Sequence, residues 1–232
     1  MSRATAAPTV GSVTTPRQER ALETRQRIVD TALELFREHG YDGTTMRAIA
    51  KEAGVSLGNA YYYFGSKEDL VLGFYDQLIS AHEARAEKVL AKETDLEARL
   101  RGVVRAWVTE AAPYKDFAGK FFRNAADPGS PLSPFSKESS PIRDRSIALY
   151  GRVLEGTKVS PLVKDDLPEL LWLYAMGIVL FWVHDDSRGT AKTLALVDRS
   201  VPLVVKLINL TRYRLLRSAV EDVRLLLAEV KR

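Results

Sequence analysis

The stretch from Thr44 to Leu70, TTMRAIAKEAGVSLGNAYYYFGSKEDL, decides the fold. It predicts two short helices joined by a tight turn at Ala53–Gly54–Val55. Gly54 relieves that turn of a Cβ atom where a positive φ is expected, and Ser56 is a suitable N-cap for the second helix. Ile49 and Phe64 can close a small core between the two helices. This is the layout of a helix-turn-helix, whose second helix enters the major groove of DNA.

The second short helix carries the residue types that contact DNA. Its first turn presents backbone N–H groups, which favour a phosphate, and Gly58 removes side-chain bulk that would hold a duplex away. Asn59 can bond base edges, and the tyrosine hydroxyls can bond phosphates. Tyr61 is expected to point largely inward. The expected DNA-contacting residues are Thr44, Thr45, Arg47, Ser56, Leu57, Gly58, Asn59, Tyr61, Tyr62, Tyr63 and Lys67.

Residues 20–72 resemble the N-terminal region of the TetR/AcrR (tetracycline-repressor) family. The matching residues are Thr44–Thr45, Ile49–Ala50, Ala53–Gly54–Val55–Ser56, Gly58, Tyr61, Phe64, Lys67–Glu68, Leu70 and the preceding helix from Arg27 to Gly40. Tyr63 stands where many members have histidine, and Ala60 where a larger apolar residue is common. These departures concern which operator bases are contacted. The resemblance implies a two-domain, all-helical dimer with a small-molecule site in its C-terminal part.

The rest of the chain is also predicted to be helical, so the expected fold class is all-α. No stretch alternates apolar and polar residues with strand-like period, and residues 126–141 form the clearest internal loop. The expected domains are a flexible basic tail (1–17), a DNA-binding domain (18–68) and a helical effector-binding and dimerisation domain (69–232). The helices expected beyond residue 93 cover about 95–112, 114–125, 142–156, 167–185, 190–210 and 214–230.

Positive charge is concentrated at the start of the chain. The formal net charge is +4, and Met1–Arg27 holds five arginines against two acids. These arginines either form an arm that contacts phosphates or a groove of DNA, or they are a solvated tail, and both interpretations stay open.

Two apolar segments favour self-association. The run Leu170–Val183 is apolar on every side, and the second segment, 194–210, is nearly as apolar. A dimer would cover both helices, so we expect a homodimer through helices at about 167–185 and 190–210. The run of 14 apolar residues is shorter than the roughly 18 that a membrane span needs. We therefore expect a cytoplasmic protein with no membrane partner, and Pro202 is expected to kink or shift the second helix.

Aromatic residues in the C-terminal part are the candidates for an effector site. By the resemblance, some of them line a cavity for a small hydrophobic effector, although a plain core position is the more usual role of such an aromatic residue. The expected ligand-binding residues are Trp107, Phe117, Phe121, Trp172 and Met176. His184 with Asp185 and Asp186 is interpreted as a polar helix end rather than a catalytic cluster.

Composition excludes several classes of function. There are no cysteines, and His39, His82 and His184 lie far apart, so neither a metal site nor a cofactor is expected. With 46% hydrophobic and 28% charged residues, the chain can fill a globular core. We interpret it as a DNA-binding regulator that binds a palindromic operator as a homodimer, with a repressor favoured over an activator. An all-helical enzyme or small-molecule-binding protein, and a dimeric adaptor that contacts protein, remain the alternatives.

Overall fold

The computed structural model describes residues 15–161, 163–211 and 213, with the backbone alone given for residues 120, 121 and 123. Within these residues all regular elements are helices, in agreement with the predicted all-α class. The chain divides into two compact units, Met1–Lys67 and Glu68–Arg232.

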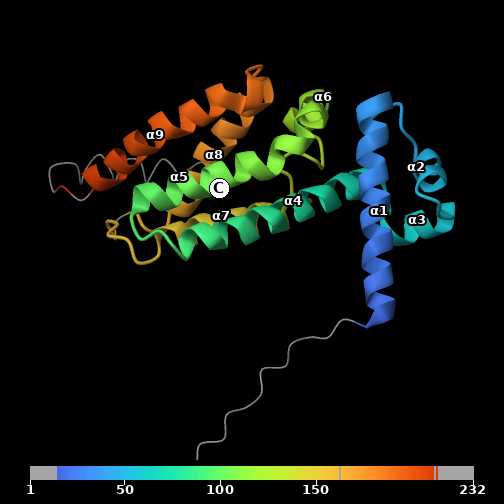
Figure 1. Cartoon of the computed structure of the whole chain (residues 1–232), viewed down its shortest axis with the longest axis horizontal. Coiled ribbons are helices and arrows are strands. Elements are labelled where there is room, and N and C mark those ends of the chain that lie inside the picture. The colour runs from blue at the N-terminus through green and yellow to red at the C-terminus, as the bar shows by residue number, and fades with distance from the viewer. Residues whose placement is uncertain (1–14, 162, 212, 214–232) are drawn as a thin grey trace, which may run out of the picture. The chain divides into compact units, whose positions relative to one another are not determined.

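The first unit contains helices α1 (Pro16–His39), α2 (Met46–Glu52) and α3 (Leu57–Tyr63). Each helix begins at a hydroxyl residue whose side chain accepts a backbone N–H three residues on, namely Thr15, Thr45 and Ser56. The core of the unit is formed by one face of α1 and the inner faces of the short helices, with Ile28, Val29, Ala32, Phe36, Ile49, Ala50, Ala60 and Phe64 all buried. The unit therefore has the three-helix arrangement that the sequence predicts (Figure 1).

The turn between α2 and α3 depends on Gly54, whose φ is +67°. The Val55 amide donates to the Ala50 carbonyl at 3.0 Å and closes the turn. An L-residue with a Cβ is strained at this φ, so the glycine is required by the backbone and not by neighbouring atoms.

In the described part of the second unit there are six α-helices, and the core consists of aliphatic and aromatic side chains from α4, α5, α7, α8 and α9. Their bounds are α4 (Lys67–Leu90), α5 (Leu96–Ala111), α6 (Lys115–Ala126), α7 (Ser140–Leu154), α8 (Leu167–His184) and α9 (Ala191–Leu210). Helix α4 begins at the last residue of the first unit and continues through the second.

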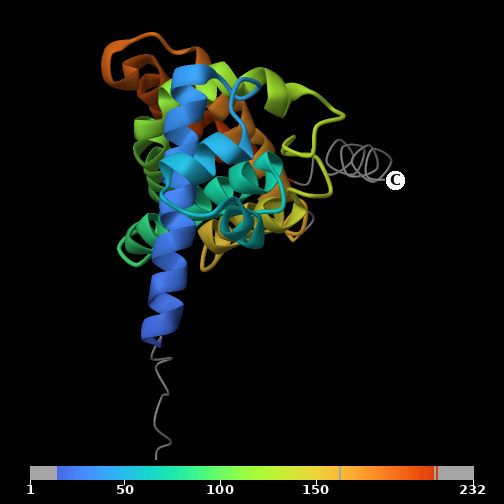
Figure 2. The same ribbon diagram turned by 90° about the vertical axis from the view of Figure 1, so that its right-hand side faces the viewer.

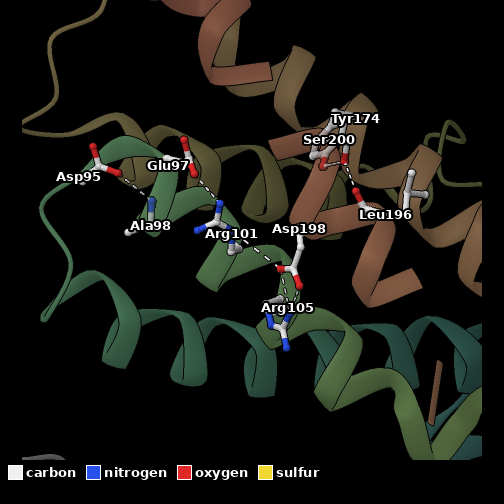
Figure 3. Close-up of polar contacts among 9 residues, drawn as sticks. All are labelled: Asp95, Glu97, Ala98, Arg101, Arg105, Tyr174, Leu196, Asp198 and Ser200. Carbon is white, nitrogen blue, oxygen red and sulfur yellow. Dashed lines mark hydrogen bonds and ion pairs between the residues drawn. The ribbon is translucent and has the colours of Figure 1, made fainter. Parts of the chain in front are cut away.

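Polar contacts tie α9 to its neighbours at the surface of this core. Asp198 of α9 accepts two hydrogen bonds from Arg105 of α5, each at 2.8 Å, and Arg101 approaches the same carboxylate (Figure 3). The hydroxyls of Tyr174 and Ser200 lie 2.7 Å apart and link α8 to α9. These pairs fix the relative positions of α5, α8 and α9.

Several boundaries differ from those expected. Helix α1 begins at Pro16, inside the segment assigned to the tail, and residues 1–14 lie outside the described residues. The helix expected at 214–230 also lies outside them. Helix α9 continues through Pro202, and the expected loop falls between α6 and α7.

Helix α8 is the most apolar described helix. Its 18 residues have a mean hydropathy of 1.5, and 33% of them are buried within the chain. By length and composition it is the one described helix that could cross a membrane, although core helices of soluble proteins meet the same criterion. Three of its large apolar side chains, Leu173, Leu180 and Phe181, are exposed on the side away from the core.

Candidate nucleic-acid interface and ligand cavity

The N-terminal turn of α3 combines the half-buried Leu57 with the exposed Ser56, Gly58 and Asn59. Ser56 accepts a hydrogen bond from the Asn59 amide at 3.1 Å, and both residues are exposed. A Cβ placed on Gly58 would meet no atom within 4 Å, so the fold itself does not require glycine there. A glycine that the fold does not need, on an exposed helix start, indicates close approach by another molecule.

The orientation expected for Tyr61 is wrong. Its side chain is 49% exposed, whereas Ala60 is fully buried and Phe64 is 3% exposed. Positions 60 and 64 are four residues apart and therefore share the inner face of α3, which turns position 61 outward. Tyr62 is 81% exposed and Tyr63 half-buried, with their rings in edge contact at 5.3 Å. The helix thus presents a polar aromatic surface.

Two residues expected to contact DNA are already engaged within the unit. Thr44 is buried, and its hydroxyl donates to the Gly40 carbonyl at 2.8 Å, so the expectation that it flanks the groove is corrected to a structural role at the end of α1. The Lys67 ammonium donates to the Tyr41 carbonyl at 2.7 Å and lies over the Tyr41 ring. Thr45 and Arg47 are exposed, as is required of DNA contacts.

Two arginines of α1 brace the helix-turn-helix, a role that sequence reasoning missed. Arg27 Nε donates to the Ala53 carbonyl at 3.0 Å, at the start of the turn. The Arg25 guanidinium lies 4.9 Å from the centre of the Phe64 ring, at the end of α3. The sequence showed a cluster of arginines but nothing that distinguished bracing residues from solvated ones.

The second unit contains a small cavity of about 30 Å³ between α4, α5, α7 and α8. Its lining consists of Ile79, His82, Val104, Trp107, Ser146, Tyr150, Trp172, Ala175, Met176, Ile178 and Val179, none of which is a lysine, arginine or carboxylate. Of the expected ligand-binding residues, Trp107, Trp172 and Met176 lie in this lining. The polar residues His82, Ser146 and Tyr150 were not anticipated, because single polar residues on apolar helices give no recognisable spacing.

The remaining two expected ligand-binding residues lie elsewhere. Phe117 is buried but packs edge-on against Phe74 at 5.7 Å, and it is absent from the lining. It therefore fills core space, since its face of α6 points toward α4. The side chain of Phe121 lies outside the described residues.

Burial lowers the pKa of His82 below its ordinary value, although a hydrogen bond to the Val103 carbonyl opposes the shift. The ring Nε2 lies 2.9 Å from that carbonyl oxygen. The imidazole is therefore neutral near pH 7 and donates from Nε2. An uncharged histidine matches the otherwise apolar lining.

The end of α8 is a structural junction. Asp185 accepts hydrogen bonds from the amide and hydroxyl of Thr193, at 2.8 and 2.6 Å, and from Ser187. These contacts hold α9 against the end of α8 and agree with the interpretation of a polar helix end. Among the described residues, no group of three histidine or acidic side chains could hold a metal ion.

An unpartnered surface, here called the α8–α9 apolar face, lies on the second unit. It consists of Leu173, Leu180 and Phe181 of α8 and Leu203, Leu207 and Leu210 of α9. The spacing within each helix keeps its three side chains on one side. Large exposed apolar residues concentrated on two packed helices indicate a protein partner or a lipid surface.

Helices α2 and α3 form a helix-turn-helix, and the second helix begins with a glycine that has open space around it. This is the arrangement found in helix-turn-helix DNA-binding proteins. Family models agree in both parts of the chain: "Bacterial regulatory proteins, tetR family" matches residues 28–73, and "Tetracyclin repressor-like, C-terminal domain" matches residues 99–226, more than half of the chain. The chain belongs to the TetR family, and it is a DNA-binding transcriptional regulator.

Individual relatives agree with this assignment. The HTH-type transcriptional regulator RutR of Escherichia coli K12 is 27% identical over 168 residues, which cover 71% of this chain and 78% of RutR. The structure of FadR from Bacillus subtilis, in complex with stearoyl-CoA, has a TM-score of 0.62 at 21% identity and covers 78% of this chain and 97% of FadR. That of Thermus thermophilus FadR, with lauroyl-CoA, has a TM-score of 0.52 at 24% identity and covers 76% and 92%. Likeness at these identities shows a shared fold.

Proposed function

We propose that the chain is a cytoplasmic repressor that binds a palindromic operator as a homodimer and releases it when a small hydrophobic effector binds. The observation that carries the proposal is the start of α3, where Gly58 and Asn59 are exposed and a Cβ on Gly58 would meet no other atom. One such helix contacts few base pairs, and two related by a two-fold axis contact both halves of a palindrome. That the relatives are regulators supports a role without catalysis.

The proposed DNA contacts follow the exposure of the side chains. Asn59 bonds a base edge, Leu57 contacts an apolar base surface, and Tyr62 bonds phosphate. Thr45, Arg47, Tyr61 and Tyr63 lie around this centre and contact the backbone, and Lys67 has hydrogen-bond capacity left beyond Tyr41.

We assign the α8–α9 apolar face to the dimer rather than to a membrane. One side of α8 is packed in the core through Leu171, Trp172 and Trp182, so only its other side is available. A spanning helix would have to expose its whole circumference or join further spans. A second copy of the same two helices covers both stripes at once.

The cavity is the proposed effector site, in which Trp107, Trp172 and Met176 provide apolar contacts. At about 30 Å³ it holds little more than water, so an effector has to separate the surrounding helices as it enters. Ile79 and His82 place α4 in the wall, and α4 is continuous with the DNA-binding unit. An effector that prefers the expanded arrangement shifts the population away from the DNA-binding form.

The lining favours an uncharged or largely apolar effector. The stearoyl-CoA and lauroyl-CoA of the two FadR structures carry phosphates, for which this cavity offers no cation. Their acyl chains match the lining, and we therefore propose acyl chains and small aromatic compounds as the first candidates to screen.

The test is a two-stage binding experiment. A duplex enriched from a random library by the full-length protein is titrated in a gel-shift assay at fixed salt, and the candidate compounds are then added. We expect Asn59→Ala and Tyr62→Ala to weaken binding by ~10-fold or more while melting like the wild type. Unchanged binding by both variants would contradict the proposed contacts, and a complex that no compound releases would contradict effector release.

A further inference from the structure

The first three turns of α1 project beyond the core of the first unit. Residues 16–27 are helical, yet the first fully buried side chain is Ile28. Both views show this end of α1 extending past α2 and α3 (Figures 1 and 2). A capping box between Thr15 and Gln18 starts the helix there. The side chains of residues 16–20 are all exposed, so the start of this extension is open to solvent or to a binding partner.

One side of the extension is a stripe of hydrogen-bond donors. Arg17, Arg20, Thr24 and Arg27 are spaced i, i+3, i+7 and i+10, which places them on one face of the helix. Glu19 and Glu23 flank this stripe, and Glu23 lies one turn from both Arg20 and Arg27. Arg17 and Arg20 are exposed. The start of the extension therefore presents two exposed guanidinium groups on the same side of the helix.

The stripe starts at the helix-turn-helix itself. Arg27 is bonded to the carbonyl of Ala53, three residues before the N-cap of α3. From Arg27 to Arg17 the helix rises ~15 Å, which corresponds to about four or five base pairs of duplex. Arg17 and Arg20 thus lie on the same helix as the contact to the turn, up to about 15 Å further along it.

We propose that Arg17 and Arg20 bind backbone phosphates of the DNA that flanks each operator half-site. The proposal rests on the DNA-binding function, and it extends the interface beyond the helix-turn-helix. Guanidinium groups match phosphate in charge and geometry, and such contacts depend on the presence of DNA and not on its base sequence.

The test varies the length of the duplex. The selected operator is prepared with no flanks and with six G·C-rich base pairs added on each side, and both are titrated in a gel-shift assay. We expect the flanks to raise the affinity of the wild type on the order of tenfold, and Arg17→Ala/Arg20→Ala to show no such rise. On the longer duplex, the slope of log affinity against log salt should become shallower by about 3 to 4 for the variant, since a dimer loses four phosphate contacts.

Lys158→Ala/Lys164→Ala is the matched control, because it removes two exposed positive charges from the second unit. It should keep the gain from the flanks, which separates contact from general charge. The inference is overturned if the wild type gains nothing from the flanks, if the arginine variant keeps the gain, or if only A·T-rich flanks produce it. A protein that enriches no duplex at all would overturn the DNA-binding function as well.

Discussion

Two glycines of the helix-turn-helix are required for different reasons. Gly54 adopts a φ of +67° in the turn, whereas Gly58 has an ordinary helical backbone and open space around it. Replacing each glycine by alanine therefore distinguishes Gly54, which the fold needs, from Gly58, which we assign to DNA binding.

We predict that Gly54→Ala lowers the free energy of unfolding by roughly 1–2 kcal/mol, because alanine is strained at that φ. Gly58→Ala should melt at or slightly above the wild-type temperature, since alanine favours helices. It should still lose operator affinity on the order of tenfold, because its methyl group holds the duplex away. Thermal melts and gel shifts check both; an operator affinity unaffected by Gly58→Ala would show that nothing approaches that position.

A second residue-scale prediction concerns Asp185. Burial raises the pKa of this carboxyl, but hydrogen bonds from Ser187 and Thr193 outweigh it and hold the pKa well below its ordinary value. Because the folded pKa is depressed, the stabilisation is present above the unfolded pKa of about 4 and is lost as the pH falls toward the folded value.

Asp185→Asn should therefore lower the urea midpoint at pH 7, and its difference from the wild type should shrink at pH 3. Asp186→Asn is the control, since Asp186 has its own pKa lowered by Lys192 but is exposed. A difference between Asp185→Asn and the wild type that is the same at pH 7 and pH 3 would argue against this carboxylate as the stabilising group.

At the scale of elements, the sequence predicts the helix-turn-helix and its turn well, but it places the start of the DNA-binding domain two residues after the start of α1. The cap Ser56 and the glycine of the turn act through local hydrogen bonds and backbone angles, which a short window of sequence contains. The inward position of Ala60 in place of Tyr61 depends on how α3 is rotated against α1, which no local pattern gives. The packing of whole helices also decides that Phe117 contacts Phe74 in the core and that His82 lines the cavity. No local sequence pattern distinguishes these two positions.

Helices α4 and α7 are joined by Arg145, which is another contact between distant parts of the sequence. Its guanidinium donates to Asp76 and Glu83, each at 2.5 Å, and to Ser80 at 3.0 Å, all on α4. The residues next to these partners in the sequence, Ile79 and His82 of α4 and Ser146 of α7, line the cavity. The arginine therefore holds together two of the helices that line the cavity and that, in our proposal, an effector separates.

We predict that Arg145→Met destabilises the second unit by about 1 kcal/mol, the upper range for a partly exposed ion-pair network. The cavity should also open more easily, so a binding compound should gain affinity. Urea unfolding and quenching of tryptophan fluorescence measure the two effects. Arg105→Met is the control, because Arg105 pairs with Asp198 of α9, a helix that contributes no residue to the cavity lining. A compound that binds Arg145→Met and the wild type equally would separate this contact from the cavity.

At the scale of the whole molecule, the proposed dimerisation would connect the two units to one function. The DNA-binding unit supplies a single α3, and the second unit supplies the α8–α9 apolar face. The sequence predicted that these two helices were too apolar for a monomer, but not which side of each remains uncovered. Leu203 and Leu207 are 58% and 64% exposed and lie one turn apart on α9.

We predict that Leu203→Glu/Leu207→Glu makes the protein monomeric and weakens operator binding, because two glutamates cannot be buried unpaired in a dimer seam. Sedimentation at micromolar concentration measures the mass, and gel shifts on full and half operators measure the functional effect. The variant should bind the full operator no better than the half operator, since one helix α3 then binds alone. Phe135→Glu places a charge at an equally exposed apolar position outside this face and should leave the dimer intact. If the Leu203→Glu/Leu207→Glu protein remains dimeric, the seam lies elsewhere, and the apolar side of α8 becomes available to lipid.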